Sequence, residues 1–521
     1  MTSQSTDVAE GCSDHELGAA PAAGFGQDWF RRLFGKGRAP KLLLRVSNQI
    51  THDGCAQSCF GKPVAKASDK ESQIFVALTF AQAGLRVRSS AQKLLALCKD
   101  AQLAWLSQTS ASSARVHCFE RLALLRKLPI IACVLAALSV SFAFGQSKLT
   151  FRPADPLNPA AFQHFYDMYY EKAIQEFTQV SQRHPEDPDA VNHLLTAVLF
   201  RELDRIGALN TGDYSNDSFI NAKHRAADPK TCNEIKQLAS KAQAMEEKRL
   251  QSNPKDVAAL YSRGVTRAQF ATYTALIEHA WFSALRNAVG ARHDHENVLE
   301  LDPKNVDAKL IVGAHNYVIG SLPWGIKAAT TVVGLGGNKE KGLQYLHEAA
   351  EGNSETSIDA KVILVVFLRR EGRLDESLQI LRTLVPQYPH NVLFAIEEGN
   401  LLRAKKQDRD AETVYRRAWE DGRAGKYSGL HYELAATALG DLLRSEKNYE
   451  GAAAAYDLVS QVQKPETEIA QKAAVGAGEM YDLLHKRDVA VKRYEAAVAV
   501  DGNSDMAQTA KKRIKDPYTG G

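Results

Sequence analysis

Two short stretches of this 521-residue sequence carry side chains that could bind a metal ion. In 292–296 (Arg-His-Asp-His-Glu), His293 and His295 are two residues apart. On a helix they point in different directions, so we expect a solvated helix face there. His347 begins half of a zinc-protease motif, but Glu351 stands where the second histidine is needed. The sequence therefore predicts no metal site at either place.

A glycine-rich stretch, 334–342, invites comparison with phosphate-binding loops. It lacks the following Lys-Ser or Lys-Thr and a preceding strand, so we expect a flexible turn between helices. Cys55 and Cys59 have no second cysteine pair at zinc spacing, and we interpret them as incidental. We expect no catalytic residue, no cofactor and no metal, with an enzyme hidden in the divergent 186–345 region as the less favoured alternative.

Charge and cysteine are unevenly distributed along the chain. Residues 1–115 hold 14 Lys+Arg against 9 Asp+Glu, whereas 146–521 hold 48 against 51. Six of the seven cysteines precede residue 134, and Cys232 alone follows it. The chain after residue 145 is slightly acidic and lacks the excess of positive charge that binds nucleic-acid phosphates, so we expect no nucleic-acid partner.

An uncharged apolar run occupies 128–144, directly after a basic pair. Small residues flank Phe144 at 143 and 145, so the order is that of a secretory signal peptide with a mature start at Gln146. About 17 apolar residues also suffice to span a bilayer. A single-pass membrane anchor and a buried core helix therefore remain as alternatives. We expect an exported protein, periplasmic or envelope-associated, that contacts a membrane only through 128–144 if this segment is kept.

Residues 1–115 show little periodicity ahead of this run, and we expect them to be poorly structured. No methionine lies between Met1 and Met168, which favours a wrongly assigned extension and a true start near Val116. Residues 116–145 would then be an ordinary leader. The alternative is a genuine cytosolic tail ahead of an anchor.

The chain after the leader repeats one pattern of small and aromatic residues. Gly399 is followed twelve residues later by Ala411, and then by Tyr415 and Ala418. The last three share one face of a helix, and the glycine lets a preceding helix approach closely. The frame recurs as Gly440, Ala452, Tyr456 and Val459, and as Gly478, Ala490, Tyr494 and Ala497. Such helix pairs must stack, since one pair cannot bury its apolar face alone.

These residues and offsets resemble the tetratricopeptide repeat, a helix-turn-helix unit of about 34 residues. The resemblance covers about 160–504 and implies an all-α superhelical solenoid. It implies divergent repeats with insertions in 146–345, regular repeats in 346–504, and a capping helix and tail in 505–521. Ser504 is the expected N-cap of that last helix.

Pro323 and Trp324 interrupt an apolar stretch from Leu310 to Leu335. We expect a kinked core segment there; the alternative is an apolar ligand or partner pocket with Trp324 as its anchor. Residues 316–324 also resemble part of a group of exported bacterial tetratricopeptide proteins of undefined function.

Tetratricopeptide proteins bind partners in a concave groove lined by the first helix of each unit. The positions that match that groove are Asn400, Arg403, Asp441, Arg444, Glu479 and Asp482. Arg403 and Arg444 fall at the same position of successive units, so we expect a mixed polar groove suited to an extended peptide or an acidic side chain. The alternative is that these residues are merely solvated.

The resemblance thus implies a non-enzymatic protein–protein interaction scaffold of the cell envelope. A membrane-anchored assembly factor, with the repeats outside the cytosol, is the alternative function.

Overall fold

The computed structural model describes residues 149–209, 225–322, 327, 336–427 and 429–520. Within these ranges the chain is helical and has no strand, and an isolated parallel bridge joins Thr150 to Ser354. The all-α prediction is confirmed for this part of the chain. The segments 1–115 and 128–144 and the side chain of Trp324 lie outside the described residues. None of the described helices is long and apolar enough to cross a membrane.

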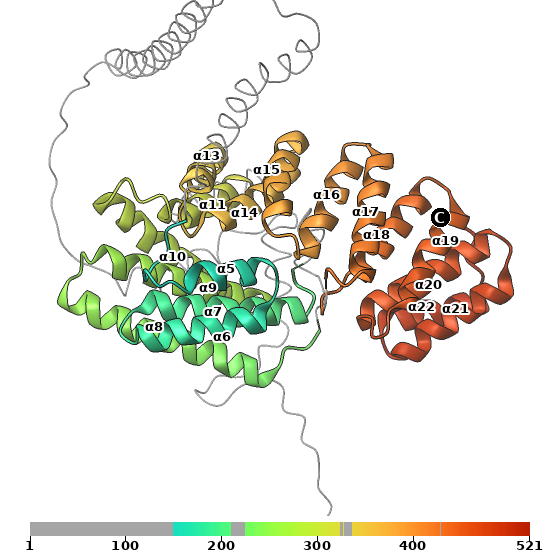
Figure 1. The fold of residues 1–521 in the computed structure, drawn as a ribbon, viewed down its shortest axis with the longest axis horizontal. Coiled ribbons are helices and arrows are strands. Elements are labelled where there is room, and N and C mark those ends of the chain that lie inside the picture. The colour runs from blue at the N-terminus through green and yellow to red at the C-terminus, as the bar shows by residue number, and fades with distance from the viewer. Residues whose placement is uncertain (1–148, 210–224, 323–326, 328–335, 428, 521) are drawn as a thin grey trace, which may run out of the picture. The chain divides into compact units, whose positions relative to one another are not determined.

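The helices follow one another as packed pairs, and each pair packs on the next (Figure 1). The pairs are α5 (Asn158–Tyr166) with α6 (Tyr170–Arg183), α7 (Pro188–Arg205) with α8 (Pro229–Ser252), α9 (Val257–Leu276) with α10 (Trp281–Leu301), α11 (Ala308–Gly320) with α13 (Lys339–Glu351), α14 (Ser357–Arg370) with α15 (Leu374–Gln387), α16 (Val392–Ala404) with α17 (Asp408–Arg423), α18 (Glu433–Ser445) with α19 (Tyr449–Asp457), and α20 (Thr467–Leu483) with α21 (Arg487–Val500). A short 3-10 helix, Leu458–Gln461, follows α19, and α22 (Asp505–Lys515) packs on the last pair. The Ser504 side chain caps α22 by accepting a hydrogen bond from the Ala507 N–H at 3.0 Å, as the sequence predicted.

Each repeat glycine lies directly beneath a tyrosine ring of the second helix in its pair. A Cβ atom added to the glycine would lie 2.3 Å from the ring for Gly399 and Tyr415, 2.5 Å for Gly440 and Tyr456, and 2.5 Å for Gly478 and Tyr494. Carbon atoms do not approach so closely, so any larger residue must push the two helices apart. The two helices of each pair are therefore in contact through the glycine and the tyrosine that stands sixteen residues after it in the repeated frame.

The pair α9 and α10 corrects the expectation of a solvated face at 292–296. His295 is 1% exposed and lies over Gly264, where an added Cβ would be 2.3 Å from the imidazole ring. His295 thus takes the place that tyrosine has in the later pairs, with Nδ1 2.8 Å from the Ala291 carbonyl oxygen. Burial lowers the pKa of His295, which keeps the ring neutral.

Asp294, beside His295, is fully buried as well. Its carboxylate lies 2.6 Å from Nη2 of Arg263 and 2.7 Å from Nη1 of Arg267, both on α9. The expectation was wrong because it treated each polar residue as solvated, whereas this position of the repeat is a packing position. Within the described residues, no group of three or more His, Cys, Asp or Glu side chains is arranged to hold a metal ion.

Candidate functional site

Three arginines lie at the same position on the first helices α14, α16 and α18. Arg403 and Arg444 come four residues after their repeat glycines, and Arg369 comes four residues after Val365, which replaces the glycine. We call Arg369, Arg403 and Arg444 the arginine row. Arg369 was not predicted from the sequence, because its helix lacks the repeat glycine. The twelve-residue spacing from Val365 to Ser377 would have identified it.

Each arginine of the row reaches the first helix of the next pair. Arg369 Nη1 donates to both carboxylate oxygens of Glu397 at 2.9 and 3.0 Å, Arg403 Nη2 donates to the Asp441 backbone carbonyl at 3.1 Å, and Arg444 Nη1 lies 2.7 Å from Glu479 Oε2. These contacts form a continuous polar strip along α14, α16, α18 and α20, which we call the first-helix face. The structure therefore brings the sequence-predicted Arg403 and Arg444 onto one face.

Asn400 and Asp441, also predicted from the sequence, anchor the repeat tyrosines. The Tyr415 hydroxyl donates to Asn400 Oδ1 at 2.7 Å, and the Tyr456 hydroxyl donates to Asp441 Oδ1 at 2.5 Å. Burial raises the pKa of both phenols, so they remain protonated donors. Lys472 Nζ lies 2.9 Å from the other Asp441 oxygen. Asn400 and Asp441 are thus used chiefly to join the helices of the face.

Glu479 and Asp482 are carboxylates buried beneath the end of the same face, with side chains 10% and 1% exposed. Glu479 lies 2.7 Å from Arg444 and 3.6 Å from Arg513 of α22. Because it lies below the guanidinium groups, Glu479 orients arginines and is not itself presented to a partner.

Asp482 accepts hydrogen bonds from three directions. Arg487 Nη1 donates at 2.8 and 3.1 Å, the Tyr494 hydroxyl at 2.9 Å, and the Tyr518 backbone N–H at 2.8 Å. Tyr518 belongs to the segment that follows α22, so the far end of the first-helix face is covered by the chain's own residues. This contact was not predicted from the sequence, since 516–520 carries no repeat pattern.

Arg403 differs from the other two members of the row. Arg369 and Arg444 each pair with a carboxylate, whereas among the described residues no carboxylate lies within ion-pair distance of Arg403. A guanidinium carries five N–H donors, and the Asp441 carbonyl engages one nitrogen of Arg403. The half-buried side chain therefore retains donors and makes no ion pair with a described carboxylate.

A second polar cluster lies where the sequence analysis named no site. Arg152, ahead of α5, lies 2.8 Å from Asp307 and 3.2 Å from Glu355, and its guanidinium is 4.2 Å from the centre of the Tyr261 ring. Glu355 also lies 3.7 Å from Nε2 of His193. These five residues, which we call the Arg152 cluster, come from segments widely separated in sequence.

Burial and neighbouring charges act on the acids of this region in opposite directions. Burial would raise the pKa of Glu355, but His193 and Arg152 outweigh it and lower that pKa. Burial, together with the charges of Glu355 and Asp307, raises the pKa of Asp359 to about 7, although the Tyr166 hydroxyl donates to Asp359 at 3.0 Å. The charged groups of the Arg152 cluster pair with one another, whereas Nδ1 of His193 is buried without a hydrogen-bond partner. The ion pairs join distant segments of the chain, so this cluster stabilises the fold.

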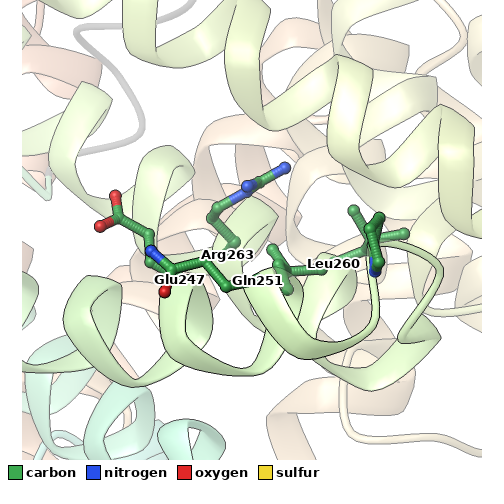
Figure 2. A pocket seen from close by; sticks show the side chains of 6 residues that line it. Glu247, Gln251, Leu260 and Arg263 are labelled. Carbon is green, nitrogen blue, oxygen red and sulfur yellow. The ribbon is translucent and has the colours of Figure 1, made fainter.

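Two hollows lie away from the arginine row. A cavity of about 350 Å³ lies between α8 and α9, where the charged ends of Glu247 and Arg263 point away from each other and Leu260 lies to one side (Figure 2). A wider cleft of about 1040 Å³ is lined by α6, α7, α8 and residues 429–431. In the smaller cavity the polar groups do not converge on one point, so it offers no constellation for catalysis.

Comparison with known proteins identifies the repeat class. Residues 305–464 match the family Iml2/Tetratricopeptide repeat protein 39. Similar solved structures include PilF of Pseudomonas aeruginosa, at 15% identity over 49% of this chain and 99% of that chain, with a TM-score of 0.30. PilW, a type IV pilus biogenesis factor, is 16% identical over 48% of this chain and 98% of its own, with a TM-score of 0.30. YrrB, a tetratricopeptide protein with an unusual peptide-binding site, is 13% identical over 51% and 97%, with a TM-score of 0.24. Identities and TM-scores this low carry no information on function.

Proposed function

Because residues 305–464 match a tetratricopeptide-repeat family, we propose that this chain works as a non-enzymatic scaffold that binds an extended, acidic segment of a partner protein on its first-helix face. Repeats of this kind expose one helix of each pair along a continuous surface, and such surfaces suit extended peptides. Recognition would involve hydrogen bonds and ion pairs, with no covalent step.

Arg403 is the observation that carries this proposal. It lies in the middle of the arginine row, it is half-buried, and no described carboxylate lies within ion-pair distance of it. A partly desolvated guanidinium gains from a charge-assisted, bidentate contact with a carboxylate. The flanking residues Arg369 and Arg444 already hold Glu397 and Glu479, so an acidic group of the partner would be directed to Arg403.

We propose further that the scaffold works outside the cytosol, in the periplasm or at the envelope. The support is the apolar run 128–144 with a basic pair before it and a small-residue cleavage pattern after it. The alternative is an assembly factor anchored by this run. N-terminal sequencing of the protein from its native cells distinguishes the two: a chain starting at Gln146 indicates cleavage, and a chain that retains 128–144 indicates the anchor.

Site-specific photo-crosslinking in the native cells tests the binding face. A benzoylphenylalanine replaces the exposed Ala404, next to Arg403, or the exposed Thr413 on α17 as a matched control. We expect one partner adduct at Ala404 that disappears when Arg403 is also changed to Ala, and no such adduct at Thr413. Adducts of equal yield at both positions, or an Ala404 adduct unaffected by Arg403→Ala, would contradict the proposal.

A further inference from the structure

The segment after α22 places one aromatic side chain close to two cations. The ring centre of Tyr518 lies 5.3 Å from the guanidinium carbon of Arg444 on α18 and 4.7 Å from that of Arg513 on α22. Arg444 Nη2 also donates to the Tyr518 hydroxyl oxygen at 3.0 Å. Guanidinium groups at this distance attract the face of an aromatic ring, so the two arginines form a clamp.

Two buried carboxylates, Glu479 and Asp482, hold the clamp residues and Tyr518 in position. Glu479 lies 2.7 Å from Arg444 and 3.6 Å from Arg513, so one buried carboxylate orients both guanidinium groups. Asp482 accepts the Tyr518 backbone N–H at 2.8 Å. The site therefore recognises the ring, the hydroxyl and the main chain of a single residue, which are the features that an extended peptide presents.

The rest of the segment makes little use of the protein surface. Asp516, Pro517, Thr519 and Gly520 are exposed, and Tyr518 alone is partly buried. An extended segment held at one residue has few contacts to lose when it leaves. A competing segment that offers the same ring can therefore replace it.

We propose that Arg444 and Arg513 form a tyrosine-binding subsite of the first-helix face, and that Tyr518 of the same chain occupies it until a partner segment containing tyrosine displaces it. This inference rests on the proposed function and adds to it the chemistry of the partner and an autoinhibitory contact. The partner segment is extended and carries an acidic residue for Arg403 and a tyrosine for the clamp.

Peptide binding to the full chain tests this proposal. The probe is a fluorescein-labelled heptapeptide, Lys-Asp-Pro-Tyr-Thr-Gly-Gly, which copies residues 515–521. A tethered segment competes at an effective concentration of roughly millimolar, so we expect the Tyr518→Ala protein to bind the probe at least about tenfold more tightly than the parent does. The same peptide with Ala in place of Tyr should not bind. Equal affinity of parent and variant for the probe, or equal binding of the two peptides, would overturn the proposal.

Matched variants separate the clamp from nonspecific charge. In the Tyr518→Ala protein, a second change of Arg444→Gln should abolish probe binding. Arg416→Gln, at an exposed arginine of α17, should leave it unchanged. Tyr518→Phe, which keeps the ring and removes the hydroxyl, should give an intermediate affinity and serves in place of Tyr518→Ala if that variant does not fold. Loss of binding in the Arg416 variant would show that the probe reads only positive charge.

The outcomes of these experiments also distinguish this inference from the proposed function. If the probe fails to bind while crosslinking at Ala404 remains dependent on Arg403, the proposed scaffold function is supported and the proposed tyrosine-binding subsite is refuted. If Tyr518 docks on a second copy, sedimentation will show a dimer that Tyr518→Ala dissociates, and occupancy within one chain is refuted. We expect the same sedimentation coefficient for both proteins.

Discussion

Two regions of the molecule join similar helix pairs by different means. In α16–α21 a glycine on one helix lies under a tyrosine on the next, and the tyrosine hydroxyl bonds to a polar residue of the first helix. In the region from α7 to α14, Arg152 joins buried acids of other segments, and a histidine takes the tyrosine position in α10. The first region depends on the fit of a glycine against a tyrosine in each pair, beside ion pairs between neighbouring helices such as Arg444 with Glu479. The second region depends on charges buried between segments that are distant in sequence.

The difference teaches that one architecture tolerates two kinds of stabilising contact with different sensitivities. A buried ion pair broken on one side leaves an uncompensated charge, whereas a glycine contact fails by steric overlap. The changes below test this contrast, beginning with the largest effect.

Arg152→Ala should destabilise the protein most. It leaves Glu355 and Asp307 buried without their cation, and loss of one partner of such a cluster costs about 3 kcal/mol in the free energy of unfolding. Arg201 is the matched control, because it also contacts two acids, Glu171 and Glu234, which are exposed. Arg201→Ala should cost less than about 1 kcal/mol. Denaturant unfolding measures both, and equal losses would show that burial of the acids is unimportant.

Gly440→Ala should have the next largest effect. The new Cβ would lie 2.5 Å from the Tyr456 ring, and overpacking of this kind costs about 1–3 kcal/mol, offset by about 1 kcal/mol of helix propensity. We expect a net loss of up to about 2 kcal/mol by thermal unfolding. Gly502→Ala is the control, since the nearest atom to its added Cβ is 3.6 Å away. If the Gly440 variant is as stable as the control, close packing of Gly440 against Tyr456 does not limit the residue at this position.

Asp359→Asn should have the smallest effect, and the effect should depend on pH. The pKa of Asp359 is raised to about 7 in the folded protein, against about 3.9 in an unfolded chain. Between these values the folded state binds more protons than the unfolded state, so this residue lowers stability as the pH rises from about 4 to 7.

The asparagine variant cannot lose that proton and keeps an acceptor for Tyr166. Relative to the parent, it should gain about 1 kcal/mol of stability between pH 5 and pH 8, with the figure kept low because Asp359 is only partly buried. Thermal unfolding at both pH values measures the gain. A difference between parent and variant that is the same at pH 5 and pH 8 would contradict the assigned pKa.

The regular helix pairs could be predicted from the sequence because their contacts lie within one repeat. Gly440, Tyr456 and the position of Arg444 all follow from a single spacing. Arg369 has the same spacing, but Val365 stands in place of the glycine, so Arg369 was not predicted from the sequence. Asn400 and Asp441 remain predictions as binding residues, and their side-chain oxygens accept hydrogen bonds from Tyr415 and Tyr456 within the protein.

The Arg152 cluster could not be predicted in this way. Arg152 and Glu355 are 203 residues apart, and neither lies in a sequence motif from which the other could be identified. The burial of His295 could be predicted only by recognising that this histidine occupies the position of the repeat tyrosine. The helices of its pair are longer than those of the later pairs, which conceals that position in the sequence. Tyr518 lies outside the repeats, so its contact with Arg444 is seen only in the structure.

The most direct test of the account is the affinity of the partner segment crosslinked at Ala404, prepared as a synthetic peptide, for the purified full chain. Loss of a charge-assisted hydrogen bond costs about 1.5–3 kcal/mol, so Arg403→Ala should weaken binding about tenfold or more, and Arg416→Ala should leave it unchanged. Binding by the Arg403 variant with the parent's affinity would contradict the claim that the arginine row is the partner-binding surface.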